Sequence, residues 1–268
     1  MKKLIIALTA VAAFSAPALA ADMAAKAPMR AAPVAYVPTW TGCYVGGGGG
    51  YGLSNIESRN IVTATGVPNG ASIDYGGRGY IGTVQAGCDY QFPIGSNQFV
   101  IGAFGDYNFS DIKGNVSGAG GAVGLNSGRD KIDWYWAAGA RVGWLVNPQT
   151  LTYFSGGYTE AHRNGVGNYI FGNFPIVGVA TGVGLQGGTN KGWFLGSGIE
   201  HTVGWFPGLT WKTEYRFSEF DRRNNAEYTV ATGVLTGNSN QDKLYTHAVT
   251  STLSYRFNWG GAPIAAKY

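Results

Sequence analysis

The chain has 268 residues and a formal net charge of +4, and only 13% of its residues are charged. That is about half the share usual in soluble domains, whereas glycine, with 44 residues, is more than twice as frequent as average. A surface with few charges and many aromatic residues suits lipid better than water. The sequence has no basic run, which argues against nucleic acid as a partner.

The first twenty residues have the pattern of an export signal. Lys2 and Lys3 supply a positive start, residues 4–14 are apolar, and residues 18–20 form a small-x-small cleavage site. The apolar stretch is too short to span a bilayer as a helix. Residues 1–20 are therefore predicted to be a signal peptide, and no later stretch is long and apolar enough for a membrane helix.

A proline-containing segment separates this signal from the rest of the chain. Residues 21–39 are rich in alanine and contain Pro28, Pro33 and Pro38 without polar/apolar alternation. We expect a flexible periplasmic arm there. A β-barrel is predicted over residues 40–257, and residues 258–268 are expected to form a C-terminal tail.

Alternation of apolar and polar residues identifies the strands. In Leu209–Phe217 the odd positions include Trp211 and Tyr215, whereas the even positions are Thr210, Lys212, Glu214 and Arg216. Successive strand side chains point to opposite faces, so this strand has one charged face and one apolar face. Segments 132–146, 80–92 and 245–257 alternate in the same way. Segments 41–53, 98–110, 151–162 and 191–203 bring the number of predicted strands to eight.

The connections between these segments alternate in length. Short links are expected at Pro93–Asn97, Asn147–Thr150 and Gly204–Gly208, and long links at about 55–78, 111–131, 163–190 and 221–242. Outer-membrane barrels have short periplasmic turns and long extracellular loops. The sequence therefore predicts an all-β, eight-stranded antiparallel up-and-down barrel in the cell outer membrane, with four long extracellular loops.

A soluble eight-stranded barrel is the alternative. Such a barrel carries polar residues outside and apolar residues inside, and alternation by itself does not say which face is outside. The low charge and the aromatic residues near segment ends, such as Trp134, Trp144 and Trp211, favour the membrane barrel, whose interfaces carry aromatic girdles.

The charged face of the strands is then the lumen. The predicted lumen charges are Asp89, Asp106, Asp133, Arg141, Glu200, Lys212, Glu214, Arg216 and Arg256. An eight-stranded barrel is barely wide enough for its own side chains, so these charges must pair or stay hydrated. The preferred interpretation is a plug of salt bridges, and the alternative is a narrow polar path for small ions or solutes.

Cys43 and Cys88 are the only cysteines of the chain. They fall at the same rim of two adjacent antiparallel segments, where directly opposed residues come within bonding range. Because export places them in an oxidising compartment, a Cys43–Cys88 disulfide is predicted. Two free apolar side chains facing lipid are the alternative.

No motif indicates catalysis or a bound group. Residues 47–52 and 182–187 fit G-x-G-x-x-G, but neither precedes a predicted helix, as a dinucleotide site requires. His162, His201 and His247 lie on separate segments without metal-ligand spacing. We therefore expect no enzyme activity, no catalytic residues, no metal and no cofactor.

Several short motifs resemble one family. Their order along the chain is Trp40–Gly47 (WTGCYVGG), Gly87–Phe92 (GCDYQF), Gly105–Asp111 (GDYNFSD) and Leu253–Phe257 (LSYRF). They resemble the alphaproteobacterial outer membrane immunogenic proteins, porin-like surface antigens related to opacity proteins and the OmpA barrel. The resemblance implies an eight-stranded barrel, surface exposure, a role in envelope integrity and host contact, and modest pore activity.

Two functions therefore remain open at this stage. The first is a structural surface protein that maintains the envelope and whose loops contact host or environmental surface ligands. The second is a porin-like channel for small solutes or ions. Expected partners are outer-membrane lipid, lipopolysaccharide and the barrel-insertion machinery, which reads a closing aromatic residue such as Phe257 or Tyr268.

Overall fold

The computed structural model describes residues 39–119, 125–166, 170–173, 176–180 and 183–257. The predicted signal peptide, almost all of the predicted arm and the predicted tail lie outside these residues. They stay predictions. No helix among the described residues has the length and hydropathy needed to cross a membrane.

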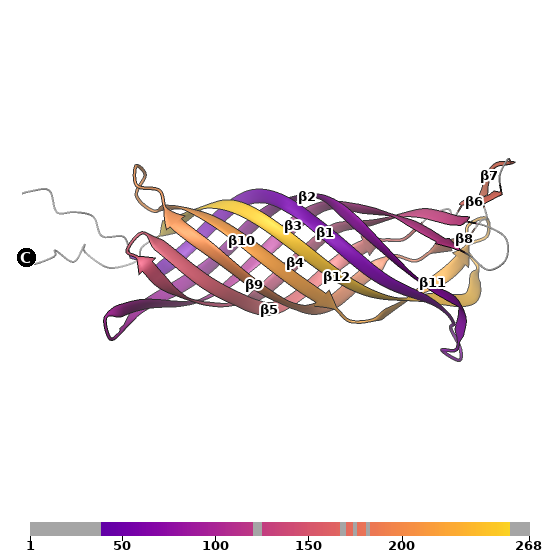
Figure 1. Cartoon of the computed structure of the whole chain (residues 1–268), viewed down its shortest axis with the longest axis horizontal. Coiled ribbons are helices and arrows are strands. Elements are labelled where there is room, and N and C mark those ends of the chain that lie inside the picture. Colours follow the sequence, from indigo (N-terminus) through magenta and orange to yellow (C-terminus); the bar gives the residue numbers. More distant parts are fainter. Residues whose placement is uncertain (1–38, 120–124, 167–169, 174–175, 181–182, 258–268) are drawn as a thin grey trace, which may run out of the picture. The chain divides into compact units, whose positions relative to one another are not determined.

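Eight strands form a closed antiparallel ring, as predicted. They are β1 (Gly42–Val62), β2 (Pro68–Ile94), β3 (Asn97–Ala119), β4 (Leu125–Asn147), β5 (Thr150–Asn164), β9 (Gly188–Thr202), β10 (Leu209–Phe220) and β12 (Leu235–Phe257). Each strand pairs with the next, and β12 pairs with β1 from Cys43↔Phe257 to Val62↔Asn238. This last pairing closes the sheet and leaves no open edge along the ring (Figure 1).

Short strands extend one end of the ring. They are β6 (Ile170–Asn173), β7 (Ile176–Ala180), β8 (Val183–Leu185) and β11 (Arg223–Thr229). β11 pairs with the first part of β12, and β8 pairs with β11, while β6 pairs with β4 and β7 with β6. Two expected long links therefore contain β-structure of their own. We call this end of the ring the long-connection end, and the opposite end the short-turn end.

The other two expected long links are mostly strand. β1 runs to Val62 and β2 starts at Pro68, so little of the expected loop 55–78 remains as a turn. Likewise, β3 and β4 stay paired from Phe99↔Trp144 to Ala119↔Leu125. The sequence pattern missed these extensions because their outward residues, such as Asp74 and Lys113, are polar and exposed, whereas apolar residues such as Ile56 and Ile112 face inward, the reverse of the membrane band. Once two strands are paired, continued pairing satisfies their backbone groups whatever the side chains are.

The structure settles which face is outside. On β10, Trp211 and Tyr215 are 58% and 44% exposed, whereas Lys212 and Glu214 are 4% and 3% exposed. The apolar stripes therefore form the outer wall and the charged stripes the lumen. This is the reverse of a soluble barrel and matches a wall that contacts lipid.

The glycine run of β1 allows close strand packing at the closing seam. Gly48 and Gly50 lie opposite Thr252 and Thr250 of β12. A Cβ atom at either glycine would collide with β12, at the carbonyl oxygen of Ser251 or of Val249 respectively. The run thus serves strand packing, and neither G-x-G-x-x-G segment precedes a helix in the described residues.

Candidate functional site in the barrel lumen

The predicted disulfide joins the first two strands at the short-turn end. Cys43 and Cys88 are directly opposed in the β1–β2 register and are bonded, with Cα atoms 3.9 Å apart. The bond ties strands whose cysteines are 45 residues apart in sequence. The prediction of a Cys43–Cys88 disulfide is confirmed.

The first charged layer, the lower charge cluster, consists of Asp89, Arg141, Glu200 and Arg256. Arg141 donates to Asp89 at 2.9 and 2.5 Å and to Glu200 at 2.8 Å. Arg256 donates to the same two carboxylates at 2.7 and 3.2 Å. Two guanidiniums thus alternate with two carboxylates, and all four residues are at most 6% exposed. The layer is electrically neutral and its charges are closely paired.

Aromatic and polar neighbours complete this layer. The guanidiniums of Arg141 and Arg256 each lie over the ring of Tyr44, at 4.8 and 5.0 Å from its centroid. Thr210 donates a hydrogen bond to Glu200 at 2.7 Å, and the carbonyl oxygen of Trp40 accepts one from Arg256 at 2.8 Å. Cation–π contact and hydrogen bonding offset part of the cost of burying the charges.

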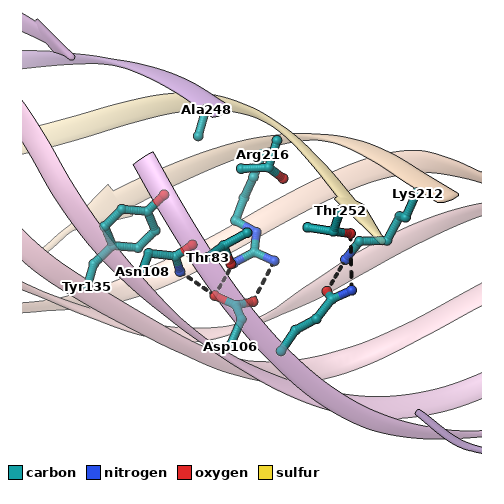
Figure 2. A pocket seen from close by; sticks show the side chains of 10 residues that line it. Thr83, Asp106, Asn108, Tyr135, Lys212, Arg216, Ala248 and Thr252 are labelled. Carbon is teal, nitrogen blue, oxygen red and sulfur yellow. Dashed lines mark hydrogen bonds and ion pairs between the residues drawn. The ribbon is translucent and has the colours of Figure 1, made fainter. Parts of the chain in front are cut away.

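The second charged layer, the middle charge cluster, consists of Asp106, Lys212, Glu214 and Arg216. Arg216 binds Glu214 at 2.7 Å and Asp106 at 2.8 Å. The ammonium of Lys212 contacts Glu214 at 3.4 Å and donates to Gln85. Figure 2 shows Arg216 and Lys212 reaching from β10 toward side chains of β2 and β3. This layer too has two cations and two anions.

A small cavity lies in the middle charge cluster. Its lining includes Asp106, Asn108, Lys212 and Arg216, and its volume is about 10 Å³ (Figure 2). That is room for about one water molecule. The cavity can therefore hydrate the charges locally, but it is far too small for a solute.

Apolar side chains fill the lumen on both sides of the charged layers. The periplasmic apolar layer, at the short-turn end, consists of Trp40, Val100 and Leu151, and Tyr153 packs with them while donating its hydroxyl to Glu214 of the middle charge cluster at 2.7 Å. The extracellular apolar layer, toward the long-connection end, contains Ile56, Ile81, Ile112, Ile132, Phe220 and Leu244, each at most 3% exposed. Ions do not cross such layers without a wide opening, because an unpaired charge in apolar surroundings is costly.

A third charged layer, the upper charge cluster, lies beyond the extracellular apolar layer. Arg163 binds Asp130 at 2.8 Å and Asp242 at 2.9 Å, and also donates to the hydroxyl of Tyr75 at 3.0 Å. Asp130, Arg163 and Asp242 were not among the predicted lumen charges, because their segments were expected to be loops. Arg163 follows Ala161 at the two-residue spacing of the inward positions of β5. Continuing that spacing past Ala161 would have predicted that Arg163 faces the lumen.

Asp133 is the predicted lumen charge that the structure does not place in any of these clusters. It lies where the β4–β5 register shifts between Ile132 and Trp134, and it binds Lys131 at 2.8 Å on the outer wall. The extra residue of a β-bulge breaks strict alternation. Extending the odd-numbered face of β4 across this bulge therefore assigned Asp133 to the wrong side. The other eight predicted residues lie in the lower and middle charge clusters.

The three histidines lie apart on the outer wall. The ring of His201 is 2.9 Å from the hydroxyl of Thr150, and that of His247 is 2.8 Å from the hydroxyl of Tyr215. His162 stacks on Trp134. Among the described residues no group of three His, Cys, Asp or Glu side chains could hold a metal ion.

A closed eight-stranded ring with an apolar outer wall and a polar lumen is the architecture of an outer-membrane β-barrel, and the protein is one. No family model matches the chain. The chain is 29% identical to the 31 kDa outer-membrane immunogenic protein of Brucella melitensis, over 96% of this chain and all of that one. It is 24% identical to the 25 kDa outer-membrane immunogenic protein of Brucella canis, over 96% and 99% of the two chains.

The sequence resemblance is thus confirmed: the chain is a homologue of the outer-membrane immunogenic proteins of Brucella. Solved structures also align with it. Neisserial surface protein A has 12% identity and a TM-score of 0.35, covering 81% of this chain and 98% of that one. OprG of Pseudomonas aeruginosa has 9% identity and a TM-score of 0.46, covering 83% and 100%. Outer-membrane barrels have short turns on the periplasmic side and long connections on the extracellular side. By that rule, the short-turn end is the periplasmic end of this barrel and the long-connection end is the extracellular end.

Proposed function

We propose that this protein is a structural surface barrel with a closed lumen, which reinforces the outer membrane and presents the short strands β6, β7, β8 and β11 at its extracellular end to the surroundings. The observation that carries the proposal is the filling of the lumen. Two neutral charged layers lie between two apolar layers, and the cavity in the middle charge cluster has room for only about one water molecule. We also propose that the protein is not an enzyme, because the lumen carboxylates that could act as catalytic acids or bases are bound in ion pairs.

The energetic case for a closed lumen rests on pairing. Opening a path would require Arg141 and Arg216 to leave carboxylates that they bind at 2.5–3.0 Å. Breaking one buried pair of this kind costs about 3–5 kcal/mol. It would also require Trp40, which is 1% exposed, to leave the periplasmic mouth. A spontaneously open state would therefore be rare.

Single-channel conductance of the refolded mature protein in planar bilayers tests the closed lumen. We expect no discrete current steps from the unmodified protein. The matched variants Arg216→Ala and Glu214→Ala each remove one side of an ion pair that the structure contains. Steps in the unmodified protein that change with these variants would refute the closed lumen and establish the channel.

The porin-like channel is the second candidate, because the middle charge cluster contains a small cavity lined by polar side chains. A deletion strain separates the two functions in cells. Increased sensitivity to detergent and chelator, restored by the unmodified protein, supports the structural role. Loss of small-solute uptake without envelope weakness would support the channel instead. Binding of the short extracellular strands to host or environmental surfaces belongs to the first function. Deleting β11 (Arg223–Thr229) and measuring that binding tests it.

A further inference from the structure

The outer wall of β2, β3 and β4 changes from apolar to charged at one level. On β3 the outward residues from Phe99 to Phe109 span 11 positions, the length that a tilted strand needs to cross the hydrocarbon core. At the extracellular limit of this band lie Tyr80, Phe109 and Trp134, of which the first two are 76% and 61% exposed. Aromatic side chains of this kind mark the level of the lipid headgroups.

Three cations lie directly beyond these aromatic residues. Arg78 of β2 is the register partner of Lys113 of β3, and Lys113 is the register partner of Lys131 of β4. We call Arg78, Lys113 and Lys131 the cation row. Like charges that face each other on adjacent strands destabilise a sheet. A row of three therefore has an electrostatic cost that an anion on the outer wall would relieve.

Two carboxylates offset part of that charge. Asp111 lies 2.7 Å from Lys113 and 3.5 Å from Lys131, and Asp133 lies 2.8 Å from Lys131. The hydrogen bond from Lys113 lowers the pKa of the Asp111 carboxyl, and the bond to Asp133 raises the pKa of the Lys131 ammonium. Both shifts favour the charged forms of Asp111 and Lys131. Among the described residues, Arg78 is exposed and has no carboxylate within ion-pair distance.

We propose that the cation row binds the phosphate groups of lipid A, the membrane anchor of lipopolysaccharide, in the outer leaflet. Three features of the outer wall fit this occupant together: positive charge in excess of the carboxylates, a position at headgroup level, and an apolar wall directly below for the acyl chains. A guanidinium and two ammonium groups are suitable donors for phosphate oxygens. This proposal depends on the proposed function only in one respect, namely that the protein is a barrel in the outer membrane.

Titration of the refolded mature protein with lipid A, followed by native mass spectrometry in detergent, tests the site. The site variant carries Arg78→Gln, Lys113→Gln and Lys131→Gln. The control variant carries Lys191→Gln, Arg222→Gln and Lys243→Gln, and so removes equal charge from β9, the β10–β11 link and β12 at the same end. We expect the site variant to lose affinity at least about tenfold and the control variant less than about twofold. Equal losses, or no loss in the site variant, would overturn the proposal.

The chemistry of the ligand and a second variant provide independent readouts. Monophosphoryl lipid A should bind the unmodified protein more weakly than bisphosphorylated lipid A, and phosphatidylethanolamine more weakly still. With divalent cations removed by chelator, Asp111→Asn with Asp133→Asn should tighten lipid A binding by about threefold, because it frees two lysines. Unchanged or weaker binding by that variant contradicts the proposal. Conductance of the unmodified protein would overturn the closed lumen but leave this site standing.

Discussion

The lower charge cluster allows a sharp test of the packed lumen. Arg141 forms ion pairs with both carboxylates of that layer, at 2.5 Å to Asp89 and 2.8 Å to Glu200. Arg141→Met keeps a long side chain but leaves two buried carboxylates with Arg256 as their one remaining cation in the layer. Loss of one partner from a buried ion pair costs about 3–5 kcal/mol. We expect the free energy of unfolding to fall by about that amount.

A charge-balanced double variant separates electrostatics from packing. Arg141→Met with Glu200→Gln removes one cation and one anion, so Arg256 and Asp89 remain as a neutral pair at 2.7 Å. Because removing a whole buried pair is often nearly neutral, the double variant should recover all but about 1–2 kcal/mol of the loss. The coupling between the two substitutions would then be at least about 1 kcal/mol.

The assay is equilibrium unfolding in guanidinium chloride of protein refolded in lipid vesicles, followed by tryptophan fluorescence and by heat-modifiable migration. Lys191→Met, at an exposed position of the outer wall, is the control and should change stability by less than about 0.5 kcal/mol. A loss below about 1 kcal/mol for Arg141→Met would refute the reasoning, because it would mean that water solvates the charges of the lumen. Additive single and double variants would refute it equally.

Three further predictions follow from other parts of the barrel. Reduction of Cys43–Cys88 should lower the free energy of unfolding by at most roughly 4 kcal/mol, the loop-closure value for a 45-residue separation; full labelling of both thiols in unreduced, unfolded protein would contradict the bond itself. Gly48→Ala should cost about 1–3 kcal/mol because its Cβ meets β12 backbone, whereas Gly82→Ala, with open space, should stay within about 0.5 kcal/mol, so equal losses would contradict the packing argument. Arg163→Met should raise amide hydrogen exchange at the extracellular end while leaving the periplasmic half protected; unchanged exchange would show that the upper charge cluster does not hold that end together.

The sequence by itself determined the parts of this protein that depend on local alternation. Clear two-residue periodicity located the ring strands at 80–92, 132–146, 209–217 and 245–257, and separated Lys212, Glu214 and Arg216 from Trp211 and Tyr215. The other four segments alternate less cleanly. Alternating link lengths established which strands are neighbours. Because antiparallel neighbours place known positions opposite each other, the same reading predicted the disulfide.

The tertiary structure decided everything that depends on interruptions of that periodicity or on contacts between distant strands. A bulge next to Trp134 places Asp133 on the outer wall, and a one-residue irregularity of this kind has no clear sequence signal. Pairing beyond the membrane band turned expected loops into strands, and so brought Arg163, Asp130 and Asp242 together from three strands. Closure of the ring then determined how completely the lumen is filled, because the size of the interior follows from strand number and register, not from any single segment.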